Sequence, residues 1–240
     1  MDGGEERIRR DAEGSGPLRL HSLEEMLALV DGIGFLPLFR CAVPGFSVEE
    51  GTCASAWWTG AEQTDPWEWR RLAAESRRVA YGKFFGRKAG FISLAWLPEF
   101  ANWRRDGYDF EARWEDAKAP WRHKKIMDLL ADGGEMFSFD LKRRAGFGPD
   151  GEKNFEGAVT ELMMQTYLVI RDFRCRLNRR LEPYGWHAAV YTTPEALWGP
   201  DAVSAAGGRT PSASRERIFA RVRERFPGAS DAQIRQVLKF

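Results

Sequence analysis

Two groups of residues carry the side chains best suited to binding or catalysis, and the first is a run of arginines. Five of them fall within ten residues: Arg171, Arg174, Arg176, Arg179 and Arg180. Guanidinium groups along an extended ribbon can follow a nucleic-acid backbone and displace its counterions. The same arginines could instead pair with surface carboxylates and keep a hairpin soluble. The spacing favours the two interpretations about equally.

The second group is aromatic and lies in and before the segment "TDPWEWRR". Its members are Trp57, Trp58, Trp67, Glu68, Trp69 and Arg70. Stacked rings beside one carboxylate could form a pocket for a flipped base or a small ligand. Several tryptophans close together more often fill a domain junction, with the neighbouring charges on a solvated helix face. We expect this second arrangement.

Other catalytic chemistry has little support in the sequence. Cys41, Cys53 and Cys175 are far apart, the three histidines are scattered, and no CxxC pair occurs. We therefore predict free thiols, no metal site and no cofactor. The sequence contains no GxSxG, Walker, HExxH or GxGxxG motif, so we identify no nucleophile with its base.

The arginine run belongs to a segment whose elements predict a winged-helix domain over residues 119–198. Three helical patterns come first, "APWRHKKIMDLLADGG", "FSFDLKRRAGFG" and "KNFEGAVTELMMQTYLV", and a hairpin ending in "WHAAVYT" follows. In its first strand Phe173, Cys175 and Leu177 alternate with charged residues, which predicts arginines on one face and apolar side chains on the other.

The third of these helices would read DNA in a DNA-binding winged helix. We expect its outward residues to include Lys153, Asn154, Glu156, Thr160, Glu161 and Gln165. Amide and hydroxyl side chains can contact base edges, but the two glutamates would meet phosphates unfavourably. An ordinary packed helix is therefore the expectation.

The remaining segments complete an α+β fold. Residues 1–17 predict a disordered leader, and residues 18–118 predict an α+β domain of mixed helices and hairpin. Residues 199–240 predict a linker and two amphipathic helices. These helices are too short to be stable alone, so they must dock on the amino-terminal domain or on a second subunit.

The composition limits the function classes. The 240 residues contain 36 Lys+Arg and 35 Asp+Glu, and residues 119–198 contain 12 and 11, so DNA binding would require a local basic patch. The start has no apolar signal-peptide core, and no apolar run reaches transmembrane length. We predict a cytoplasmic protein without a membrane partner.

Several segments resemble one bacterial family. "FANWRRDGYDFEARW", "GEKNFEG" with "MQTYLV", and "YGWHAAVYTTPEALWG" resemble the AlkZ-related proteins over roughly residues 20–200. These proteins in turn are similar to winged-helix DNA glycosylases that excise alkylated and crosslinked bases. Those glycosylases carry a Gln-x-Gln or Gln-x-Asp catalytic motif, and none of the four glutamines here forms it. The resemblance implies the fold and a DNA-related ancestry, and it supplies no catalytic residue.

Two functional hypotheses follow. The first is a winged-helix protein that binds duplex DNA through the hairpin and the start of the third helix, with a link to base-damage repair and uncertain glycosylase activity. The second is a non-catalytic module that binds protein, including a second copy of itself through the carboxy-terminal helices.

Overall fold

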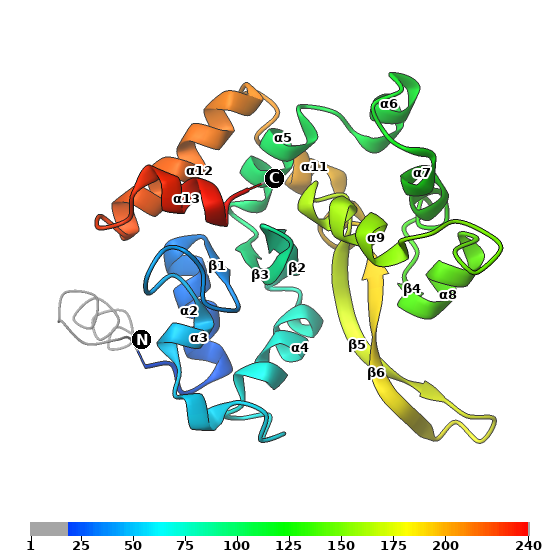
Figure 1. Cartoon of the computed structure of the whole chain (residues 1–240), viewed down its shortest axis with the longest axis horizontal. Helices are drawn as coiled ribbons and strands as arrows, with labels where there is room; N and C mark the ends of the chain where they lie inside the picture. The colour runs from blue at the N-terminus through cyan, green and yellow to red at the C-terminus, as the bar shows by residue number, and fades with distance from the viewer. Residues whose placement is uncertain (1–18, 240) are drawn as a thin grey trace.

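The computed structural model describes residues 19–239, so the predicted leader lies outside the described residues. The chain forms helices and two antiparallel three-stranded sheets, which confirms the α+β fold (Figure 1).

The first half contains α2 (Leu23–Ile33), β1 (Phe35–Pro37), α3 (Val48–Gly51), η1 (Ala54–Ala56), α4 (Pro66–Ser76), β2 (Val79–Phe85), β3 (Lys88–Ser93), α5 (Leu97–Arg105) and α6 (Phe110–Glu115). The second half contains α7 (Trp121–Asp128), β4 (Met136–Phe137), α8 (Ser138–Arg144), α9 (Phe155–Met164), β5 (Val169–Leu177), β6 (Pro183–Thr192), α10 (Pro194–Trp198), α11 (Pro200–Ser204), α12 (Pro211–Arg225) and α13 (Asp231–Val237).

The first sheet has the strand order β1-β3-β2. β1 is an edge strand, as expected for a segment that contains Pro37, which has no N–H to donate to a ladder. β2 and β3 are joined by Gly86 and Arg87, which both have positive φ, as a two-residue hairpin turn of type I′ requires.

The second sheet has the order β4-β6-β5 and belongs to the segment predicted as a winged helix. The elements follow the order helix, short strand, helix, helix, hairpin, and the short strand β4 pairs with β6. One detail differs from the prediction, because β4 separates the first two helices. Phe137 precedes α8 as its cap residue, with no side-chain hydrogen bond.

The hairpin of β5 and β6, called the wing below, forms a long ribbon that projects from the rest of the protein (Figure 1). The predicted alternation along β5 is interrupted, because the register shifts between Ile170 and Asp172 and again between Arg174 and Arg176. Each irregularity disturbs the period of two. Asp172 is consequently buried, whereas Leu177 is 57% exposed.

The carboxy-terminal helices dock on the amino-terminal part of the chain. Ile218, Phe219 and Val222 of α12 are buried, and α12 packs against α5 and α2. Arg221 donates hydrogen bonds to the carbonyls of Gly32 and Ile33, which end α2. The apolar faces of these helices are therefore covered within one chain. The predicted linker also contains a helix, α11, which contacts α5.

One hydrophobic cluster joins both parts of the chain. It runs from α2 through the first sheet and α5 to α9 and the start of β5. The boundaries at residues 118 and 198 remain a prediction.

Candidate nucleic-acid interface

The arginines at the base of the wing are held by carboxylates. Arg174 donates hydrogen bonds to Glu135 at 2.5 Å and to Asp172 at 2.7 Å, and Arg171 Nε lies 3.8 Å from Glu135. The hydrogen bond to Glu135 and then that to Asp172 raise the pKa of Arg174 above its usual value, despite the opposing effect of partial burial. Here the arginines stabilise the hairpin, which is the structural alternative described above.

The distal half of the wing is different. Arg176, Arg179 and Arg180 are exposed, and no carboxylate of residues 19–239 forms an ion pair with them. The guanidinium of Arg176 stacks over the ring of Phe139 in α8, with its carbon 3.5 Å from the ring centre. This contact places the distal wing beside α8.

A shallow groove of about 490 Å³ lies between α8 and the wing. Arg143, Arg176 and Tyr184 are among its lining residues. Residues 138–144 and 176–184 together contain six lysines and arginines against two acids, Asp140 and Glu182. We call these two segments the α8–wing surface. It is locally basic in a chain whose overall charge is nearly balanced.

The third helix of the arrangement is not available for reading DNA. Within α9 only Glu156 is exposed and Glu161 half-buried, and the other eight residues are buried. Thr160, which we expected to face outward, is 4% exposed and accepts a hydrogen bond from Lys83 of β2 at 3.4 Å. The first sheet therefore packs on the face that would enter a major groove.

The two predicted contact residues before α9 serve local structure. Asn154 caps the helix, since its side chain accepts a hydrogen bond from the N–H of Gly157 at 3.0 Å. Lys153 donates hydrogen bonds to the carbonyls of Gly148 and Pro149. Both residues are exposed, but these bonds direct their polar atoms to their own loop.

The predicted aromatic group separates into three environments. Trp57 and Trp58 line a cavity, together with residues from the segment after β1. The ring of Trp67 contacts that of Trp58 at a tilt of 44°. The guanidinium of Arg70 lies between the rings of Trp67 and Phe173, 3.6 Å and 4.2 Å from their centres.

The other two members of the group, Glu68 and Trp69, do not line that cavity. Trp69 is fully buried in the core and donates its indole N–H to the carbonyl of Gln63. Glu68 lies 3.4 Å from Arg71, as a surface ion pair.

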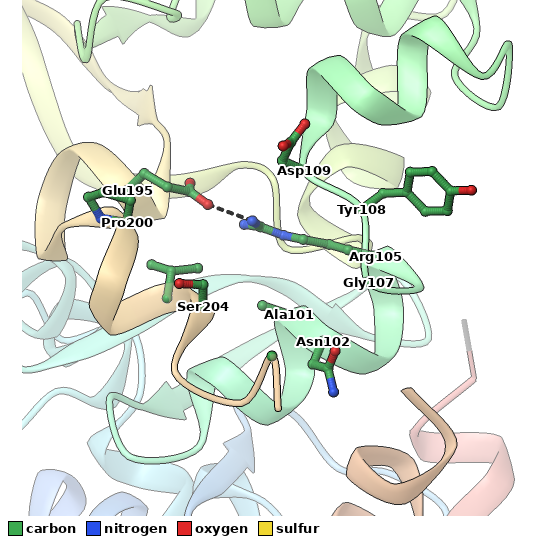
Figure 2. Close-up of a pocket in the computed structure, with 11 residues that line it drawn as sticks. Ala101, Asn102, Arg105, Gly107, Tyr108, Asp109, Glu195, Pro200 and Ser204 are labelled. Carbon is green, nitrogen blue, oxygen red and sulfur yellow. Dashed lines mark hydrogen bonds and ion pairs between the residues drawn. The ribbon is translucent and has the colours of Figure 1, made fainter. Parts of the chain in front are cut away.

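A second cavity, of about 320 Å³, lies at the junction of α5, α10 and α11, and no pattern in the sequence indicates it (Figure 2). Arg105 extends across it and donates a hydrogen bond to Glu195 at 2.5 Å. The guanidinium also donates to the hydroxyl of Thr166 at 3.3 Å and to its carbonyl at 2.6 Å. The partners lie 61 and 90 residues from Arg105, so no local pattern could predict them. The guanidinium of Arg105 is therefore engaged in structural hydrogen bonds.

A buried histidine lies between α7 and α9. His123 is 2% exposed, and its Nε2 lies 3.1 Å from a carboxylate oxygen of Glu161, which also accepts a hydrogen bond from Arg122 at 2.7 Å. Burial lowers the pKa of His123 to about 4, against the opposing effect of Glu161. The neutral ring is therefore a packed donor to Glu161 at neutral pH.

Within residues 19–239 no three His, Cys, Asp or Glu residues are grouped so that they could hold a metal ion. None of the helices there has the length and apolar character needed to cross a membrane. The three cysteines are free.

Comparison with known proteins supplies one match. The model of the AlkZ-related family matches residues 20–239. The chain belongs to the AlkZ-related family. This confirms the resemblance seen in the sequence and extends it through the carboxy-terminal helices. Neither the curated proteins nor the solved structures gave a match.

The four glutamines of this AlkZ-related chain lie in three places in the structure. Gln165 ends α9, Gln233 belongs to the capping box of α13, and Gln63 precedes α4. Gln236 also lies on α13, three positions after Gln233, a spacing that is not that of Gln-x-Gln.

Proposed function

We propose that this protein is a cytoplasmic DNA-binding protein that contacts the duplex backbone through the α8–wing surface and reads no sequence through α9. The grouping of Arg176, Arg179 and Arg180, without carboxylate partners in residues 19–239, carries the proposal. Cations that have no internal partner can exchange counterions for phosphates, whereas Arg171 and Arg174 would first have to leave Glu135.

Family membership supports a role connected with base-damage repair, since the AlkZ-related proteins resemble base-excising glycosylases. The proposal assigns no catalytic residue.

The test is the anisotropy of a labelled duplex, measured with purified protein across a salt series. We expect micromolar or weaker binding at moderate salt, with an affinity that falls steeply as salt increases. Replacing Arg179 and Arg180 by glutamine removes two exposed charges. The slope of log affinity against log salt should then become less steep by about two.

The matched control is the double substitution of Arg223 and Arg225 by glutamine, on α12. It removes the same charge from exposed positions outside the α8–wing surface. It should change the slope little. Equal effects of the two double variants would show that only total charge matters, and an unchanged slope in the wing variant would exclude this interface.

A second candidate function rests on exposed apolar side chains at the same tip. Leu181 is 76% exposed, Leu177 57% and Tyr184 48%. Exposed apolar groups of this kind also suit a protein partner. Substituting Leu181 by serine should leave DNA binding and its salt slope unchanged if the arginines are the contacts. Loss of a protein complex in that variant would support the second function.

A further inference from the structure

A cavity of about 350 Å³ lies between the segment after β1 and the segment after η1. Phe39, Trp57 and Trp58 form its aromatic wall, and its charged lining residues are Arg40, Glu49 and Glu50. These residues come from two stretches of chain that are nearly adjacent to one another in sequence. The cavity is a separate feature from the α8–wing surface, because the two share no lining residue.

The rings of the aromatic wall contact one another. The ring centres of Phe39 and Trp57 are 5.8 Å apart, and those of Trp57 and Trp58 are 6.0 Å apart. The indole N–H of Trp57 donates to the hydroxyl of Thr52 at 2.9 Å, which fixes that ring.

Trp58 is held in an exposed position by its backbone. It is 63% exposed and has a φ of 66°, a conformation that is costly for a bulky residue. The buried carboxylate of Asp65 stabilises this turn by accepting hydrogen bonds from the N–H groups of Trp58 at 3.2 Å and Gly60 at 2.9 Å. The chain thus holds a large ring at the cavity edge, at a cost in backbone strain.

The carboxylates of the cavity are also fixed. Glu49 accepts a hydrogen bond from the N–H of Arg40 at 2.7 Å. Glu50 accepts one from the hydroxyl of Ser47 at 2.7 Å and one from the N–H of Gly45 at 3.2 Å. The only guanidinium in the lining is that of Arg40, whose side chain is 71% exposed and whose Nε lies 3.8 Å from Glu50. The lining therefore carries two carboxylates and one guanidinium, and the guanidinium is largely exposed to solvent.

We infer that this cavity binds an organic cation, an alkylated ammonium group. The faces of aromatic rings attract cations, and they do so best for quaternary ammonium groups, which lose little hydration on binding. An anion would be repelled by Glu49 and Glu50, and a neutral apolar ligand would desolvate these carboxylates without compensation. A nucleotide stacked on Trp58 would bring its phosphate toward the same two carboxylates.

The test compares choline with 3,3-dimethyl-1-butanol, its neutral isostere, on the full-length protein. Binding is followed by calorimetry and by the indole N–H signals of the protein in NMR spectra. Choline should bind with a dissociation constant on the order of 1 mM, and the neutral alcohol at least about tenfold more weakly. Equal binding of the two compounds would overturn the inference, and so would no binding of choline at about 50 mM.

Substitutions locate the site. Trp58→Ala should weaken choline binding about three- to tenfold, and Trp58→Phe should retain part of it. Trp121→Ala is the matched control, because Trp121 is 54% exposed and lies outside the cavity. If Trp121→Ala weakens binding as much as Trp58→Ala, the cavity is not the site.

Charge substitutions test the sign of the ligand. Glu49→Gln should weaken choline binding, whereas Arg40→Gln should strengthen it by removing the competing cation. The opposite pair of changes, or binding of single-stranded oligonucleotide that depends on Trp58 and improves in Glu49→Gln, would show that the ligand is anionic and overturn the inference.

A peptide with trimethyllysine, compared with the same peptide carrying unmodified lysine, separates two sources of the cation. Tighter binding of the methylated peptide than of choline indicates a modified protein side chain, and binding no tighter than choline indicates a small molecule. The site does not depend on DNA binding, so its success or failure leaves the proposed function untouched.

Discussion

Lys83 of β2 donates a hydrogen bond to the hydroxyl of Thr160 on α9 at 3.4 Å, across 77 residues of sequence. At this contact the first sheet covers the helix that a DNA-reading winged helix inserts into the major groove. Lys83 also lies 4.0 Å from Glu156, the one exposed residue of α9. The same order of elements as in a DNA reader therefore coexists with a buried third helix, and any DNA contact must come from other surfaces.

The buried position of Thr160 gives a first prediction. In a DNA-reading helix, Thr160→Arg would add a phosphate contact and strengthen binding. Here it should bury an unpaired charge, lower the free energy of unfolding by about 3 kcal/mol and add no DNA affinity. Urea unfolding and duplex anisotropy measure both quantities. Glu156→Arg, on the exposed side of the same helix, should keep the stability within about 0.5 kcal/mol of the original.

Glu135 gives a prediction with opposite signs for stability and binding. It holds Arg174 and lies 3.8 Å from Arg171, so Glu135→Gln should cost about 0.5 to 1 kcal/mol of stability. The same substitution removes a negative charge beside the wing and releases two arginines. DNA affinity should consequently increase at low salt. A decrease in affinity would indicate that Glu135 orders the wing for binding, contrary to the proposed interface.

The cavity in Figure 2 gives a prediction about stability. The side chain of Arg105 is 9% exposed, and it joins α5 to Thr166 and to Glu195 of α10. Arg105→Met should lower the free energy of unfolding by about 3 to 5 kcal/mol, because it leaves the Thr166 carbonyl and the Glu195 carboxylate without their donor. Glu195 is 35% exposed, so Glu195→Gln should cost about 1 kcal/mol. If the two variants lose the same free energy of unfolding, Arg105 is not the residue that holds this junction together.

His123 should make stability depend on pH. Burial lowers its pKa in the folded protein to about 4, below its ordinary value of 6.5. Well above pH 6.5 the imidazole is neutral in the folded and the unfolded protein, so the free energy of unfolding has its full value. As the pH falls toward 4, the imidazole binds a proton in the unfolded chain before it does so in the folded protein, and the free energy of unfolding decreases. Urea unfolding should show a loss of up to about 3 kcal/mol over this interval.

In the variant His123→Asn the free energy of unfolding should depend much less on pH over that interval. Glu161 changes the stability separately, at lower pH. Burial raises the pKa of its carboxyl group, but the hydrogen bonds from Arg122 and His123 and the charges of these residues outweigh that effect and lower the pKa. A profile that declines only below pH 4.5 in the original protein would contradict the assignment to His123.

Several helix starts in this chain are coded locally. Ser22 caps α2 by accepting a hydrogen bond from the N–H of Glu25, and Pro66 begins α4 behind the cap residue Asp65. These signals act over three or four residues, so they can be read without knowledge of the tertiary structure. The hairpin of the wing was predicted for the same reason, since its two strands are consecutive in the chain.

The candidate site could not be predicted to the same depth. The five arginines are equivalent in sequence. In the structure Glu135, 39 residues before Arg174, binds two of them, and the distal three have no carboxylate partner within residues 19–239. The burial of α9 depends on β2, and the aromatic cavity depends on Phe39 from another segment. Such partners are set by tertiary packing, for which a single sequence has no periodic signal.

The docking of α12 on the first helix has a consequence for synthesis of the protein. Phe226 packs on Phe46 with ring centres 4.8 Å apart, and the carbonyls that end α2 are bound by Arg221. Ile234, Val237 and Leu238 are buried in the same hydrophobic cluster as Leu27. A nascent chain therefore lacks this part of the cover of α2 until α12 and α13 have been translated, although α4 and the first sheet pack on α2 earlier. The surface of α2 that the two late helices bury is open to chaperones and to aggregation for that time.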